Sequence, residues 1–277
     1  MPHEAAQPAG DVSPATDVSP ASLRLAIARL ARPAIDPGSL PFGEAEVDRT
    51  LGGGLMRGAL HEVAPEAEGD APVAGGFCAG ILVRALAREK TKPILWIRHD
   101  LATVEDGAPY GPGLKALGLD VARILFVLAS NANEVLDAME HALRSATLAA
   151  VFGELRGNAK LDLRAPRRLA LAAGHGATPA LLLRLGAGEQ LRAPVAAATR
   201  WRIAARASGD APANGVGLPR MKADLIRNRR GSAASFSLEW RIHDRTFRIP
   251  ALRERLAPPP VGRPHHAPAQ AERRASA

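Results

Sequence analysis

The chain has 277 residues, of which 47% are hydrophobic and 4% aromatic, so we expect one sizeable core built mainly of Ala, Leu, Val and Ile. Its single cysteine, Cys78, excludes an internal disulfide, fits a reducing compartment and is interpreted as a small buried hydrophobe. No apolar run approaches the roughly 18–20 residues that cross a bilayer, so we expect a cytoplasmic protein without membrane contact.

The net charge of +8 is concentrated in the last third of the chain. Residues 200–256 carry thirteen basic and five acidic residues, whereas residues 1–199 carry twenty basic and twenty-two acidic residues. This asymmetry predicts a surface that contacts nucleic acid or an acidic protein. A basic face that contacts only solvent stays open as the alternative, because the excess is nearly all Arg in an Ala-rich chain.

Both ends of the chain are predicted to be disordered. Residues 1–20 contain a Pro-broken direct repeat, Asp-Val-Ser-Pro-Ala, and almost no large apolar side chain. Residues 252–277 form a basic tail rich in Pro and Arg, in which His265 and His266 are too few ligands for a zinc site. The residues between, 21–251, are predicted to form one domain.

The central part of the chain alternates between short apolar strands and amphipathic helices. After a helix at 22–32, strands are expected at 60–63, 93–97, 124–128, 149–152 and 180–183. Helical segments are expected at 77–89, 113–118, 133–147 and 161–173. Short, continuously apolar strands separated by helices predict an α/β fold whose mostly parallel sheet is covered by helices on both faces.

The last third changes to a period near two. Four segments there mix apolar and charged residues without helices between them, at 201–206, 220–226, 235–240 and 246–249. The pattern predicts an antiparallel extension of the sheet with one solvated face, on which the Arg side chains would lie. Residues 208–219 are rich in Gly, Pro and Asn and are expected to form a loop.

The turn after the first parallel strand is where such sheets bind phosphate. Here it runs from Ala64 to Ala71 and departs from the phosphate-loop pattern G-x-x-x-x-G-K-[ST]. Gly69 holds a glycine position, but Asp70 replaces the phosphate-binding Lys and Ala71 replaces the Mg²⁺-binding hydroxyl. Acidic side chains are expected to crowd the turn and repel a triphosphate: Glu62, Glu66, Glu68 and Asp70. We therefore expect no cofactor, no ATP turnover and no catalytic residues.

The second acidic position of a phosphate-loop ATPase, an Asp that ends a neighbouring strand, is also missing. Gly153 stands near the place of that Asp, and Glu154 follows it. Glu154 is a candidate for contact with a metal or a basic partner. The favoured interpretation is a strand-end charge in solvent or paired with a nearby Arg. No metal site is predicted.

Two segments resemble the RecA-like ATPases. Leu51-Gly-Gly-Gly-Leu-Met-Arg-Gly58 resembles the glycine turn that those proteins place before the phosphate loop. The segment Asp224–Gly231, followed by Phe236–Trp240, is similar to their late K-x-R strand and turn. In active relatives the two basic residues reach phosphates bound by a neighbouring subunit, and Arg227 and Arg229 hold the matching positions here.

Together with the broken phosphate loop, these segments and residues 199–203 make the chain resemble the ImuA family over roughly residues 38–250. The resemblance implies a RecA-like fold and an accessory role in the SOS response to DNA damage, in mutagenic translesion synthesis. The partners it implies are an ImuB-like polymerase homologue and the alpha subunit of an error-prone replicative polymerase, with RecA and DNA as further candidates.

Three functions stay open. The first is a non-enzymatic accessory subunit that binds protein partners, and DNA or RecA as candidates. The second is a RecA-class ATPase or ATP-gated switch, which Asp70 disfavours. The third is an SOS cell-division inhibitor, because ImuA-like sequences resemble that protein too; the greater length and the basic last third disfavour it.

The predicted contacts with DNA or a partner come from the last third. Arg200, Arg202 and Arg206 alternate along one strand and are expected on one face, near Arg227 and Arg229. The full set of candidates is Arg200, Arg202, Arg206, Lys222, Arg227, Arg229 and Arg230. Trp201 and Trp240 are expected in the core. The tail at 252–277 is either inert or contributes to binding of the polymerase-like partner.

Overall fold

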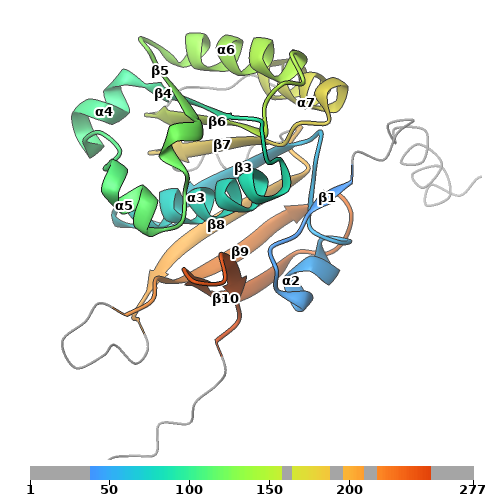
Figure 1. Ribbon diagram of the computed structural model, residues 1–277, viewed down its shortest axis with the longest axis vertical. Coiled ribbons are helices and arrows are strands. Elements are labelled where there is room, and N and C mark those ends of the chain that lie inside the picture. The colour runs from blue at the N-terminus through green and yellow to red at the C-terminus, as the bar shows by residue number, and fades with distance from the viewer. Residues whose placement is uncertain (1–37, 158–163, 188–195, 209–216, 251–277) are drawn as a thin grey trace, which may run out of the picture.

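The computed structural model describes residues 38–157, 164–187, 196–208 and 217–250. The predicted disordered ends, the helix expected at 22–32 and most of the loop expected at 208–219 lie outside these residues. Within them the chain forms a nine-stranded sheet with helices on both faces, plus a two-stranded ribbon (Figure 1).

The elements of the first half are β1 (Ser39–Leu40), α2 (Ala45–Thr50), β2 (Leu55–Met56), β3 (Leu60–Pro65), the 3₁₀ turn η1 (Glu68–Asp70), α3 (Ala71–Arg88), β4 (Ile94–His99), α4 (Asp100–Asp106), α5 (Gly111–Ala116) and the 3₁₀ turn η2 (Val121–Arg123). Those of the second half are β5 (Ile124–Ala129), α6 (Ala132–Arg144), β6 (Ala150–Arg156), α7 (Arg164–Gly176), β7 (Ala180–Leu185), β8 (Thr199–Arg206), β9 (Arg220–Asn228), β10 (Ala234–Arg241) and β11 (Thr246–Arg248).

The large sheet has the strand order β11-β10-β9-β8-β3-β7-β6-β4-β5. All neighbours from β8 to β5 are parallel, and all neighbours from β8 to β11 are antiparallel. The predicted α/β class, with a mostly parallel sheet and an antiparallel C-terminal extension, is therefore confirmed. Alternate side chains of β3, β4, β6 and β7 enter two separate cores, one under α3 and one under α6 and α7.

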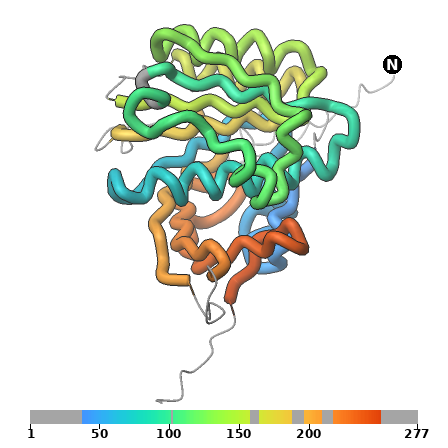
Figure 2. Tube along the Cα trace, turned by 60° about the vertical axis from the view of Figure 1, so that its left-hand side comes forward, coloured from blue at the N-terminus to red at the C-terminus, as the bar shows by residue number. Residues whose placement is uncertain are grey.

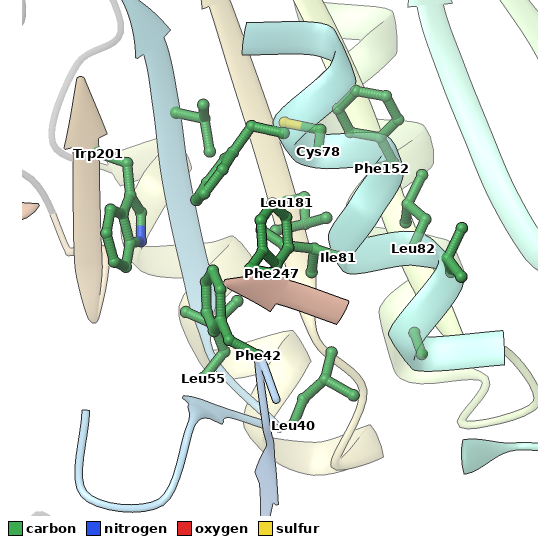
Figure 3. Close-up of a cluster of buried hydrophobic side chains, with 14 of the residues drawn as sticks. Leu40, Phe42, Leu55, Cys78, Ile81, Leu82, Phe152, Leu181, Trp201 and Phe247 are labelled. Atoms are coloured by element: carbon green, nitrogen blue, oxygen red, sulfur yellow. The ribbon is translucent and has the colours of Figure 1, made fainter. Parts of the chain in front are cut away.

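Helix α3 is the central element of the larger core. Figures 1 and 2 show it between the parallel strands and the antiparallel strands, which curve around its other side. In Figure 3, Phe247 lies beside Ile81 of α3. The ring centroid of Phe42 is 5.0 Å from that of Phe247 and 5.6 Å from that of Trp201. Cys78 is buried in the same core, as predicted, and burial raises the pKa of its thiol.

The run Glu68–Arg88 is the one candidate membrane span among the described residues, judged by length and apolar composition. Ten residues of α3 are buried against the sheet and its antiparallel extension. This burial is typical of the central helix of a packed domain, because the helix meets apolar side chains of the parallel strands and of the antiparallel extension.

The structure differs from the predicted elements mainly at helix ends and in short helices. Helix α3 begins at Ala71 rather than at residue 77, since Pro72 fits the first turn, where its missing N–H is not needed. Helix α2 was not predicted, because it has six residues and one buried side chain, Val47. It is held by a tertiary contact: the Asp48 carboxylate accepts hydrogen bonds from the backbone N–H groups of Phe42 and Gly43.

A buried hydrogen-bond chain joins β8, β3 and β2. The Nε2–H of His61 donates to the carbonyl of Met56 at 2.8 Å, so Nδ1 accepts from the hydroxyl of Thr199, also at 2.8 Å. The indole N–H of Trp201 in turn donates to the Thr199 oxygen at 3.0 Å. His61 is fully buried, and burial lowers its pKa from 6.5 to about 4.

Two glycines of α3 provide a matched test of this packing. A Cβ at Gly80 would lie 2.5 Å from Cζ of Phe247, whereas one at Gly76 would meet nothing within 4 Å. We expect Gly80→Ala to lower the free energy of unfolding by about 1–3 kcal/mol through overpacking. Gly76→Ala should raise it by up to about 1 kcal/mol through helix propensity. Chemical denaturation measures both, and equal stabilities would contradict the described packing of α3 against β11.

The depressed pKa of His61 predicts that stability falls in mild acid. Between pH 6.5 and about 4 the unfolded chain binds a proton that the folded chain excludes, so lowering the pH through this window favours unfolding. The full effect is about 3 kcal/mol. Urea titrations at pH 7 and pH 4.5 should show a smaller difference for His61→Gln than for the wild type. His141→Gln, at an exposed site, should keep the wild-type difference.

Candidate functional site

The turn between β3 and α3, predicted to be a broken phosphate loop, is closed by its own carboxylate. Oδ2 of Asp70 accepts a hydrogen bond from the backbone N–H of Ala67 at 3.0 Å, and Oδ1 accepts one from the N–H of Ala205 in β8 at 2.8 Å. A phosphate loop directs its amides at the ligand phosphates. Here the Asp70 carboxylate binds one amide of the turn and connects the turn to the end of β8.

The other residues of the turn provide no phosphate ligand. Ala64 is buried in β3, Ala71 begins α3, and Gly69 borders open space. Glu68 is exposed and lies 3.3 Å from Arg156. The structure thus places apolar or acidic side chains where an ATPase has a lysine and a hydroxyl.

The prediction that Glu62 crowds this turn is wrong. Glu62 lies within β3, is fully buried, and pairs with Arg184 at 3.2 Å and with Arg200 at 2.5 Å. Its side chain points to the sheet face opposite α3, because Leu60 and Glu62 alternate with Val63. Glu66 does lie at the turn, near Arg202 and Lys222.

At the end of β6, side-chain packing disfavours the aspartate that phosphate-loop ATPases carry at this position. A Cβ at Gly153 would lie 2.2 Å from Sδ of Met139 in α6, so an aspartate does not fit there without displacing Met139. Glu154 points to the opposite face and pairs with Nε of Arg98 at 2.9 Å and with Nε1 of Trp96 at 2.8 Å. The interpretation as a charge paired with an Arg is confirmed, but the pair is buried rather than solvated, and desolvation raises the pKa of Glu154.

No cluster of three or more His, Cys, Asp or Glu residues suited to a metal ion occurs in the part of the chain that the structure describes.

The basic residues of the last third do not form one exposed face, contrary to our prediction. Arg200 is opposite Arg227, as expected, but β9 runs antiparallel, so Arg206 is opposite Arg220 at the other end of the sheet. Six residues along a strand span about 20 Å. Arg200 is also removed from the surface, because its guanidinium is buried against Glu62.

Two of the remaining candidates for contact with DNA or a partner form ion pairs near the phosphate turn. Arg202 and Lys222 both pair with Asp224, at 3.1 and 2.8 Å, and both lie within 4 Å of Glu66. Arg206 is exposed at the carboxyl end of β8. This part of the extension is therefore a mixed ion network rather than a cationic surface.

Arg227, Arg229 and Arg230 form what we call the basic end. All three are exposed, and the ion pairs found among the described residues do not involve them. Asn228 Nδ2 donates to the carbonyl of Thr50, and the Arg230 side chain approaches Gly52. The two segments that carry the family resemblance, distant in sequence, thus lie together at the end of the sheet opposite the phosphate turn.

Strand β5 is an exposed apolar edge of the sheet, a feature not predicted from the sequence. Four consecutive side chains are 39–55% exposed: Leu125, Phe126, Val127 and Leu128. The prediction that the parallel strands are covered on both faces is wrong here, because β5 ends the sheet and only part of α6 reaches it. A continuous apolar run is typical of a central strand that is buried on both faces. The sequence of β5 therefore did not indicate that this strand lies at the edge of the sheet.

A cavity of about 630 Å³ opens beside the first turns of α3, at the carboxyl ends of β4, β6 and β7. Its walls are mainly apolar, and the Arg98–Glu154 pair lies among them. Its lining comes from five separate segments of the chain, so no local motif could have predicted it.

No family model matches the chain. The chain is similar to the protein named ImuA in two strains of Caulobacter vibrioides, with 34% identity over 212 residues that cover 72% of this chain and 82% of each relative. Among solved structures it is similar to the crystal structure of the RadB recombinase, with a TM-score of 0.50 and 16% identity, over 76% of this chain and 98% of that one. The second likeness shows the fold alone, and it confirms the RecA-like class predicted from the sequence.

Asp70 and Glu68 provide a matched test of the closed turn. Asp70→Ala removes two hydrogen bonds to backbone N–H groups and should lower the free energy of unfolding by about 1–2 kcal/mol. Glu68→Ala removes one exposed ion pair and should change it by less than about 0.5 kcal/mol. Urea denaturation compares the two variants. Wild-type stability in Asp70→Ala would show that the carboxylate does not hold the turn.

Proposed function

Because the chain belongs to the ImuA family, we propose that it acts as a non-catalytic, RecA-like accessory subunit of damage-induced, mutagenic translesion synthesis. The observation that carries the non-catalytic part is the Asp70 carboxylate, which stands in place of the phosphate-binding lysine and binds the turn from within. The proposal places the protein in the cytoplasm and requires no cofactor.

An ATPase or ATP-gated switch is the alternative, and two features argue against it. A triphosphate at this turn would meet the carboxylates of Glu66, Glu68 and Asp70, and like charges at short range repel. The position of the Mg²⁺-binding aspartate is Gly153, which is packed under Met139. Phosphoryl transfer depends on both the lysine and the metal.

We propose that the ImuB-like polymerase homologue binds at β5. An edge strand with exposed apolar side chains is a template on which a segment of another protein adds a strand. Leu125 and Val127 lie on one face of β5, and Phe126 and Leu128 on the other, so both faces offer apolar contacts. The alpha subunit of the error-prone polymerase joins the same assembly in this proposal.

The basic end is proposed as a contact for DNA, or for the RecA filament on it. Arg227, Arg229 and Arg230 are exposed and lie at one end of the sheet, so their charges add in one place. Contacts between Arg and phosphates bind without sequence preference and weaken as the salt concentration rises.

The partner proposal is tested by binding of the purified chain to the ImuB-like homologue from the same organism. The pair of changes Val127→Glu and Leu128→Glu should weaken binding at least tenfold, because each places a charge on the proposed interface. Leu171→Glu, at a 62% exposed site on α7, is the matched control and should bind as the wild type. Equal affinity of the β5 variant and the control would remove β5 as the interface.

The same variants separate the accessory role from a nucleotide switch. The β5 changes should lower the frequency of damage-induced mutation in cells, and binding to the homologue should be the same with or without Mg²⁺ and ATP. Saturable binding of an ATP analogue that Arg227→Ala weakens would instead support the nucleotide switch.

A further inference from the structure

The cavity beside α3 is a recess that the proposed function does not use. Its volume is about 630 Å³. The large apolar side chains in its wall are Trp96 of β4, Leu114 and Leu117 of the α5 region, and Leu183 and Leu185 of β7. A recess of this size and composition accommodates one or two large apolar side chains, because binding pockets are mainly apolar with few polar groups.

Small residues of α3 create the space. Gly75 and Gly76 line the cavity, and a Cβ at either position would meet nothing within 4 Å. Ala79 continues the same helix surface one turn on. By contrast, Gly80, one turn after Gly76 on the same surface of the helix, is covered by Phe247 and Trp240. The first turns of the helix are thus bare at Gly75 and Gly76, where they face the cavity.

The polar groups inside the cavity neutralise one another. Arg98 pairs with Glu154 at 2.9 Å and donates from Nη1 to the carbonyl of Gly107 at 2.6 Å. The second oxygen of Glu154 accepts from Trp96 Nε1. Both charged residues are at most 5% exposed. A ligand therefore meets an interior without net charge, and an apolar group is what such an interior stabilises.

An acidic cluster, which we call the rim, adjoins the cavity at Asp106, a residue of the cavity lining. Arg156 is the shared partner of three carboxylates, Glu68 of η1 and Glu105 and Asp106 of α4. The hydrogen bond to Glu105, together with these charges, raises the pKa of Arg156, so it carries one positive charge against three negative ones. The excess of negative charge repels phosphate and attracts cations over several ångströms.

The apolar surface also continues beyond the cavity. Phe126 of β5 packs edge-on against Trp96, with ring centroids 5.9 Å apart, and is 45% exposed. Tyr110 at the mouth of the cavity is 73% exposed. An extended polypeptide segment can contact the recess and these two side chains together.

We infer that this cavity binds a segment of a protein partner in which a large apolar side chain is flanked by Lys or Arg. The apolar side chain enters the recess beside Gly75 and Gly76, and the basic flanks lie against the rim formed by Glu68, Glu105 and Asp106. The inference goes beyond the proposed function, since it does not depend on which partner β5 binds.

The test uses two fluorescent hexapeptides, Arg-Ala-Phe-Leu-Ala-Arg and Glu-Ala-Phe-Leu-Ala-Glu, with blocked ends. Fluorescence anisotropy should show saturable binding of the basic peptide, at least tenfold tighter than that of the acidic peptide at low salt. The preference should shrink at 0.5 M salt, because the rim charges are screened.

The site of binding is located by filling the recess. Gly76→Leu places a branched side chain in the cavity and should weaken binding of the basic peptide at least tenfold. Gly174→Leu is the matched control on α7, where an added Cβ meets only the carbonyl oxygen of Gly58 at 3.8 Å. It should bind as the wild type, and thermal unfolding confirms that both variants are folded.

The charge requirement is tested with the double variant Glu105→Gln, Asp106→Asn, which should reduce the preference for the basic peptide at least fivefold. Three outcomes overturn the inference: equal binding of the two peptides, full binding to Gly76→Leu, or displacement of the peptide by Mg²⁺ and ATP. None of them bears on the β5 proposal, which is measured with the polymerase homologue.

Discussion

The buried carboxylate of Glu62 connects the two halves of the sheet. It lies on β3, and its oxygens bind Arg184 on β7 and Arg200 on β8, so one anion spans three adjacent strands. A buried charge is tolerated only when it is paired, so this carboxylate requires both arginines beside it. With β8 fixed beside β3, the antiparallel strands that follow are carried around α3, and Trp240 and Phe247 close the core on its far side.

The same use of internal pairs explains how the fold differs from an ATPase. Asp70 binds the amides of its own turn and of β8, and Glu154 binds Arg98 and Trp96. Groups that would otherwise meet nucleotide or metal are thus satisfied by the chain itself, and buried polar groups so satisfied rigidify a structure. What the fold leaves for partners is its periphery: the β5 edge, the basic end and the acidic-rimmed cavity.

Predictions from local sequence were correct for the main elements and wrong for two buried charged residues. The positions of the long strands and of the longer helices followed from periodicity, and the loss of the lysine at Asp70 was visible in the motif. Glu62 was expected to crowd the turn although it lies within the strand predicted at 60–63, and Arg200 was expected on an exposed face although it is buried. Both errors have one cause: each residue looks exposed until its partner, more than a hundred positions away, is known.

The sequence by itself determined the α/β class, the antiparallel extension, the defective phosphate turn and the family, because these depend on residue types and on spacings along the chain. Only the tertiary structure decided which charges are free, which strand is the edge, and where a cavity opens. Those properties depend on the order of strands in the sheet. Strand order is set by packing and by buried ion pairs between distant segments, and neither leaves a periodic signal in the sequence.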